Sequence, residues 1–113
     1  MATYANLYVD QGSDFATSVI VDDANGDPLD LTDVNLSGQV RRSYQSETAF
    51  DFVITKADST GGEIRIRLPD ETTAAMKFGR YVYDVYGEDT QSDTTFKIIE
   101  GILEIIPRVT RNL

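Results

Sequence analysis

The sequence predicts an all-β protein: a seven-stranded antiparallel β-sandwich with one short helix before the sixth strand. Apolar and polar residues alternate in short runs, and clusters of Gly, Pro, Asn and Asp separate these runs about every 8–14 residues. A chain of 113 residues fits a single domain, 1–113, which can bury about 65% of its unfolded surface without disulfides or metals.

The alternation of apolar residues places the first five strands. They are expected at residues 3–10, 14–22, 34–42, 49–55 and 63–68. In the third of these runs every second residue from Val34 to Val40 points inward, which is the clearest alternation in the chain. Asn25-Gly26, before this strand, is the preferred dipeptide of a two-residue type I′ turn, because both positions need positive φ.

Residues 69–76 interrupt the β pattern and predict one or two helical turns. Pro69 suits a first-turn position, and the two acidic residues that follow it suit a helix N-terminus. Ala74, Ala75 and Met76 are expected to cover one end of the core.

Residues 79–106 form the densest apolar and aromatic run and predict two long strands joined by a polar loop. The first is expected to be central in its sheet, with its tyrosines in the core. The second is expected near an edge, where Ile98, Ile102 and Ile106 face outward between glutamates. Such a stripe is an aggregation hazard in a monomer and an interface in an assembly.

The last residues, 107–113, form a short C-terminal tail after Pro107. Two interpretations stay open: a frayed terminus, or an arm that docks on a neighbouring subunit. In the second, the interface residues continue from the isoleucine stripe into the tail. The tail residues concerned are Arg108, Val109, Arg111 and Leu113.

The composition argues against catalysis. The chain has no Cys, His or Trp, so it lacks thiolate nucleophiles, zinc–thiolate sites and the commonest general base. No GxSxG, SxxK, GxGxxG or Walker pattern occurs. Acidic pairs such as Asp84 and Glu100 are ordinary in an acidic protein and are no glycosidase signal alone. The sequence therefore predicts no enzyme, no cofactor and no metal.

The net charge of −9 is concentrated near the N-terminus. Residues 10–33 hold seven aspartates and no lysine or arginine. This balance disfavours nucleic acid and anionic membrane as partners and favours a solvated rim. Two alternatives stay open: Asp23, Asn25 and Asp27 as calcium ligands, or a basic partner. Five arginines would form a basic stripe if the third, fifth and sixth strands are neighbours. These arginines are Arg41, Arg42, Arg65, Arg67 and Arg80.

The N-terminal residues lack the basic and apolar regions of a signal peptide, and no window has the ~18 apolar residues of a membrane span. Synthesis and residence in a cytosol are therefore expected until the protein joins an assembly.

The run Gly79-Arg80-Tyr81-Val82-Tyr83 is similar to the tyrosine corner of immunoglobulin-like sandwiches, in which a tyrosine opens the sixth strand. Tyr83 then stands where such a domain would carry its second cysteine. A tyrosine is bulky enough to fill that place.

The order of the segments GSDF, DANGDPLDLT, GGEIRIRL, TTAAMKFGRYVYDV and EGILEIIPRVTR resembles small immunoglobulin-like virion proteins of tailed bacteriophages, above all cyanobacterial phages. More distantly, it is similar to N-terminal domains of upper-baseplate adaptors. The resemblance covers residues 7–111 and rests on spacing rather than on one specific motif. It implies a non-enzymatic structural protein of the head, neck or tail/baseplate, made in the host cytoplasm. Its partners would be other virion proteins and copies of itself.

Two other functions remain open from the sequence. One is a carbohydrate- or cell-surface-binding module, for which Tyr8, Tyr44 and Tyr86 are the candidate exposed aromatics. The other is an immunoglobulin-like domain with a different partner.

Overall fold

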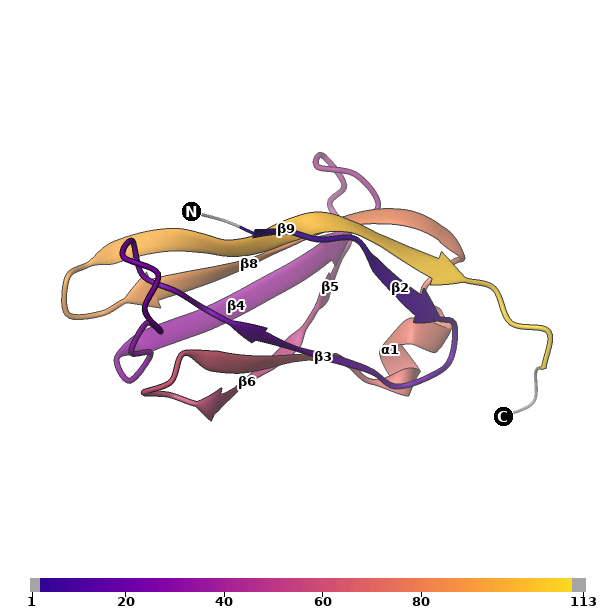
Figure 1. The fold of residues 1–113 in the computed structure, drawn as a ribbon. Coiled ribbons are helices and arrows are strands. Elements are labelled where there is room, and N and C mark those ends of the chain that lie inside the picture. The colour runs from indigo at the N-terminus through magenta and orange to yellow at the C-terminus, as the bar shows by residue number, and fades with distance from the viewer. Residues whose placement is uncertain (1–2, 111–113) are drawn as a thin grey trace.

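Two β-sheets pack face to face in a computed structural model that describes residues 3–110 (Figure 1). The predicted all-β sandwich is therefore confirmed. The elements are β1 (Thr3–Tyr4), β2 (Leu7–Asp10), β3 (Phe15–Ile20), β4 (Val34–Arg41), β5 (Ala49–Asp51), β6 (Val53–Asp58), β7 (Glu63–Leu68), α1 (Asp70–Ala75), β8 (Gly79–Asp89) and β9 (Thr94–Ile106).

The larger sheet has six strands in the order β1-β9-β8-β4-β5, with β2 also paired to β9, and the smaller sheet has the order β3-β7-β6. Both β1 and β2 run parallel to β9, whereas all other pairs are antiparallel. The prediction of a wholly antiparallel sandwich is therefore wrong: the large sheet is mixed. β8 is central, as predicted, but β9 is not an edge strand, because the N-terminal strands cover its free side.

Two predicted strands are each divided, so the described chain has nine strands rather than seven. Residues 3–10 break after Tyr4, where the Ala5 carbonyl turns toward the core and accepts a hydrogen bond from Tyr83 Oη at 2.7 Å. Residues 49–58 break at Phe52, where the chain passes from the large sheet to the small one. Sequence alternation continues through the second break, as Phe50, Phe52 and Ile54 show, so it could not reveal that one; the first run alternates only loosely.

The core lies between the sheets and follows the predicted alternation. Ile64, Ile66 and Leu68 of β7 are fully buried, and Val34 and Val40 of β4 are buried opposite them. Each such side chain contributes about 1.5–3 kcal/mol by its removal from water. The inward face is thus correct for most of the predicted strands, even where their bounds are not, although Tyr4 of the first run is 64% exposed and Ile98 of the last is buried.

The helix α1 closes one end of the sandwich, beside the last residues of β9 (Figure 1). Met76 is buried as predicted, but Ala74 and Ala75 are exposed, which corrects that part of the prediction. Thr73 is buried instead, because it lies on the same side of the turn as Met76 and donates a hydrogen bond to Ser13 O at 2.8 Å. Among residues 3–110, no helix is long and apolar enough to cross a membrane.

Two tyrosines of β8 anchor the large sheet. Tyr81 Oη donates to Lys77 O at 2.7 Å, four residues upstream, as the predicted tyrosine corner requires. Tyr83 is 4% exposed and packs edge-on against Phe52, with ring centroids 5.8 Å apart. Burial raises the pKa of Tyr83 to about 12. Tyr83 therefore fills the core as predicted and also holds the N-terminal segment.

Candidate interaction surface

The outward side chains in the middle of the large sheet form the candidate surface, which we call the outer sheet face. They come from β4, β8 and β9, whose alternation leaves every second residue outside the core. Its members are Gln39, Arg41, Arg80, Val82, Asp84, Glu100, Ile102, Glu104 and Ile106.

Ile98 does not belong to this face, which corrects one of the predicted interface residues. It is only 5% exposed and joins the core. The pairing of β8 with β9 shifts between Val85 and Tyr86, whose partners are Ile99 and Lys97, so Ile98 is the extra residue of a β-bulge. Alternation restarts after the bulge, which leaves Ile102 and Ile106 partly exposed on the outer sheet face.

The centre of the outer sheet face is an apolar cross-strand pair. Val82 and Ile102 stand directly opposite each other on β8 and β9. The neighbouring pair on one side is Arg80 with Glu104, and on the other side Asp84 with Glu100. An apolar centre with a charged surround is the usual composition of a protein–protein contact.

Two carboxylates beside this pair are held close together. Asp84 and Glu100 are opposite each other, and like charges in such positions destabilise a sheet. Burial raises the pKa of Asp84, an effect that the charges of Lys97 and Arg41 oppose. Lys97 Nζ lies 3.2 Å from Glu100 Oε1, the one ion pair within residues 3–110, and this hydrogen bond raises the pKa of Lys97.

A shallow hollow of about 230 Å³ lies over these charges. Tyr44, 78% exposed, overhangs it from the loop after β4, and Arg41 Nη1 donates to Ser46 O within that loop. Gln39 and Glu100 are among the side chains that line the hollow. An aromatic ring beside several planar polar groups is an arrangement that can orient a polar ligand.

The C-terminal tail extends away from the sandwich past the end of β9 (Figure 1). Arg108 folds back so that its guanidinium covers the backbone at Gly12, where any Cβ would collide with it. Val109 is 96% exposed. The structure thus places Arg108 against the sandwich and Val109 away from it. Arg111 and Leu113 lie outside the described residues, so their predicted part in an interface stays a prediction.

The acidic loop before β4 is shaped by its own hydrogen bonds. Asp23 Oδ1 accepts hydrogen bonds from Asn25 N at 2.9 Å and from Asp27 N at 3.1 Å. Gly26 has φ +84° but Asn25 has no positive φ, so the predicted type I′ turn is wrong and the loop is longer. Within residues 3–110, no three His, Cys, Asp or Glu side chains are grouped to hold a metal ion.

The predicted arginine stripe is divided between the sheets. Arg41 and Arg80 lie on the large sheet, and Arg42 follows β4. Arg65 and Arg67 lie on β7 of the small sheet, so the strands that the stripe requires are not all neighbours. The stripe is therefore wrong as a single surface.

Two apolar residues that belong to or border the candidate surfaces were not among the predicted contacts, the partly exposed Val82 and the exposed Phe78. Val82 could have been found, because it follows the same alternation as its neighbours on β8. Phe78, 61% exposed, precedes β8 in a connection whose side-chain directions no strand period determines.

Comparisons with known proteins add no family. No protein-family model matches the chain, and no curated protein matches it. Among solved structures, Listeria monocytogenes InlP is 13% identical with a TM-score of 0.48, over 93% of this chain and 28% of that one. A family 123 glycoside hydrolase from Clostridium perfringens is 11% identical with a TM-score of 0.45, over 96% of this chain and 24% of that one. The NK cell receptor Nkp44 is 10% identical with a TM-score of 0.47, over 94% of this chain and 99% of that one.

The chain thus spans about a quarter of the length of the first two of these proteins. Likenesses of this degree carry no argument about function, which has to be argued from the residues of this chain.

Proposed function

We propose that the sandwich is immunoglobulin-like. The Tyr81–Lys77 hydrogen bond, the packing of Tyr83 where a cysteine would stand, and the division of strands between the two sheets support this class. The sheet that contains the last two long strands carries the outer sheet face.

We further propose that the chain is a non-enzymatic structural protein of a tailed-bacteriophage virion, on the head, neck or tail/baseplate, present in several copies. The observation that carries assembly is the apolar pair Val82–Ile102, which stays partly exposed on the outside of a central strand pair and is flanked by charged pairs. The resemblance of the segment order to phage virion proteins supplies the setting. In this proposal Ile102, Ile106 and the tail from Arg108 contact a neighbouring subunit, while Ile98 supports them from the core.

The proposal is tested on particles and on the purified protein. Peptide mass spectrometry of purified virions is expected to detect the chain at a fixed copy number, and light scattering of the purified protein is expected to show a defined oligomer. A strictly monomeric protein that is absent from virions would contradict both parts.

A second candidate function is carbohydrate binding in the hollow under Tyr44. The aromatic ring, Arg41, Gln39 and the two carboxylates supply the stacking and hydrogen-bonding groups that a sugar requires. A glycan array decides between the two: binding that Tyr44→Ala abolishes favours this candidate, whereas a blank array with a high virion copy number favours the structural role.

A further inference from the structure

The loops at one end of the sandwich carry a charge equal to that of the whole protein. Three connections meet there, and together with the strand-end residues beside them they comprise residues 21–33, 58–63 and 89–94. They hold nine Asp or Glu residues and no Lys or Arg, and the chain has a net charge of −9. Hydrogen bonds join the three, because Leu31 N donates to Ser59 O and Thr90 N donates to Asp33 O. We call this end the acidic end.

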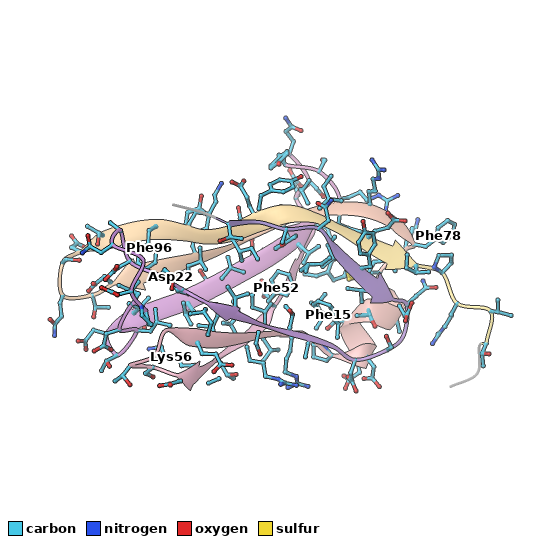
Figure 2. The ribbon with its side chains drawn as sticks, viewed as in Figure 1. Phe15, Asp22, Phe52, Lys56, Phe78 and Phe96 are labelled. Carbon is cyan, nitrogen blue, oxygen red and sulfur yellow. The ribbon has the colours of Figure 1, made fainter. Side chains whose placement is uncertain are left out.

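The acidic end also contains a hollow with an apolar floor, which we call the acid-rimmed hollow. It measures about 590 Å³. Leu29, Phe96 and Ile98 supply apolar walls, and Asp22 is one of its acids; Figure 2 shows Phe96 and Asp22 at the same end. Its other charged lining residues are Asp23, Asp89 and Lys97, of which Lys97 is paired with Glu100.

The opposite end presents the complementary features. Phe78 is 61% exposed and lies at the far end of the long axis from Phe96 (Figure 2). It borders an open hollow that three cations line, Arg42, Lys77 and Arg108, and no carboxylate lines it. Arg42 is held in place, because its guanidinium stacks 4.9 Å from the Tyr81 ring centroid and donates to Phe78 O at 3.3 Å. We call this feature the Phe78 knob.

We propose that the Phe78 knob of one copy inserts into the acid-rimmed hollow of the next. The aromatic ring would cover the apolar floor while the three cations face the acidic rim. Two independent features support one occupant. An exposed aromatic matches a hollow with apolar lining residues, and a hollow lined by three cations and no carboxylate matches one lined by three aspartates and a single lysine that is already paired. This inference rests on the proposed structural role and names the partner of the tail region as a second copy of the chain.

The geometry sets the kind of assembly and its strength. Knob and hollow lie at opposite ends of a molecule 46 Å long, so the contact is heterologous and repeats head to tail, closing into a ring or extending as a filament. The cross-section is only 28 × 21 Å, which limits the buried area to the range of weak contacts. Because rim charges are screened within about 3 Å in 1 M salt, association is expected to weaken with salt.

Two variants separate the halves of the contact. Lys77→Glu with Phe78→Glu destroys the knob and leaves the hollow intact. Asp22→Arg blocks the hollow and leaves the knob intact; the Asp22 side chain makes no hydrogen bond to residues 3–110, so the turn is preserved. The matched control is Arg65→Glu with Val53→Glu on the small sheet, which replaces an exposed base and an exposed apolar residue by the same charges.

The experiment measures the weight-average mass by sedimentation, at protein concentrations up to about 1 mM in low and in high salt. Wild type and the control are expected to associate in low salt and to dissociate in high salt. Each test variant alone is expected to associate at least tenfold more weakly. Mixing the two test variants is expected to restore binding at wild-type affinity, but only as far as a 1:1 dimer, because each supplies one functional end.

The experiment can fail for the knob-and-hollow contact without failing for the proposed structural role. A wild type that stays monomeric in low salt, a control that loses association equally, or a mixture that forms no dimer would each overturn the knob-and-hollow contact. Detection of the chain in virions, together with an oligomer that depends on Ile102 instead, would leave the structural role standing without this contact.

Discussion

The two faces of the β8–β9 pair differ in what they do for the molecule. On the inward face, Tyr83 and Leu103 are buried against the small sheet. On the outward face, Val82 and Ile102 form an apolar pair in the same register, and both side chains stay partly exposed. The same strands thus carry one apolar surface that is buried in the core and a second that the fold leaves partly exposed.

Apolar character alone therefore does not identify the residues of the core. In one chain, adjacent residues such as Ile102 and Leu103 can have opposite roles, and direction relative to the sheet decides between them. The outer face of the small sheet shows the alternative, because arginines occupy the corresponding central positions of β7, at Arg65 and Arg67. A face that is meant for water carries charges at its centre.

The inward face is expected to show the largest effect on stability. Leu103→Ala removes a fully buried side chain and leaves a cavity, so the free energy of unfolding should fall by about 2–5 kcal/mol. Urea unfolding followed by circular dichroism measures it. A loss below about 1 kcal/mol would mean that the inward face is not the principal core.

Tyr83→Phe is expected to have a smaller effect, on both stability and its pH dependence. Loss of the bond to Ala5 O should cost about 0.5–1.5 kcal/mol. Because burial raises the pKa of Tyr83 to about 12, the wild type should lose stability as the pH rises from about 10, the ordinary value, through 12. Tyr83→Phe should lack that part of the loss, with Tyr81→Phe as the comparison; equal alkaline profiles in wild type and Tyr83→Phe would contradict the assignment.

Asp84→Asn is expected to act in the opposite direction on the outward face. Burial raises the pKa of the Asp84 carboxyl in the folded protein, so the ionised carboxylate lowers the stability of the fold. This loss of stability is fully present above the pKa of the folded state. It disappears as the pH falls below the pKa of the unfolded state. At pH 7 the variant should be more stable by about 0.2–1 kcal/mol, because the repulsion from Glu100 is removed. Thermal unfolding at pH 7 and near pH 3 measures the gain, which should vanish at the lower pH; a gain that persists there has another cause.

Alternation predicted which residues face inward in most strands, because a buried face has to be apolar whatever its partner is. It could not predict pairing. The parallel attachment of β1 and β2 to β9 and the change of sheet at Phe52 depend on contacts between distant segments. The alternation also gave the wrong direction for Ile98. There the extra residue of a β-bulge reverses which side chains face inward, and no turn residue in the sequence marks the bulge.

For the candidate surfaces, the sequence predicted Ile102, Ile106 and Arg108 as interface residues, which stays a prediction, and it did not point to Phe78. Strand residues have a period that gives their direction, whereas the direction of a side chain in a connection is set by the tertiary contacts around it. The charge of the acidic end was visible in residues 10–33, but its concentration at one end emerged only when loops from three parts of the chain came together.

Assembly through the outward face of β8–β9 is tested by Ile102→Lys, measured for oligomer mass by light scattering and for stability by urea unfolding. The expected result is a free energy of unfolding within about 0.5 kcal/mol of wild type together with loss of the oligomer. Leu103→Ala is the matched control on the adjacent residue and should show the reverse order of effects. If Ile102→Lys instead unfolds the monomer and leaves assembly of the remaining folded protein intact, the outward stripe is core and the claim is wrong.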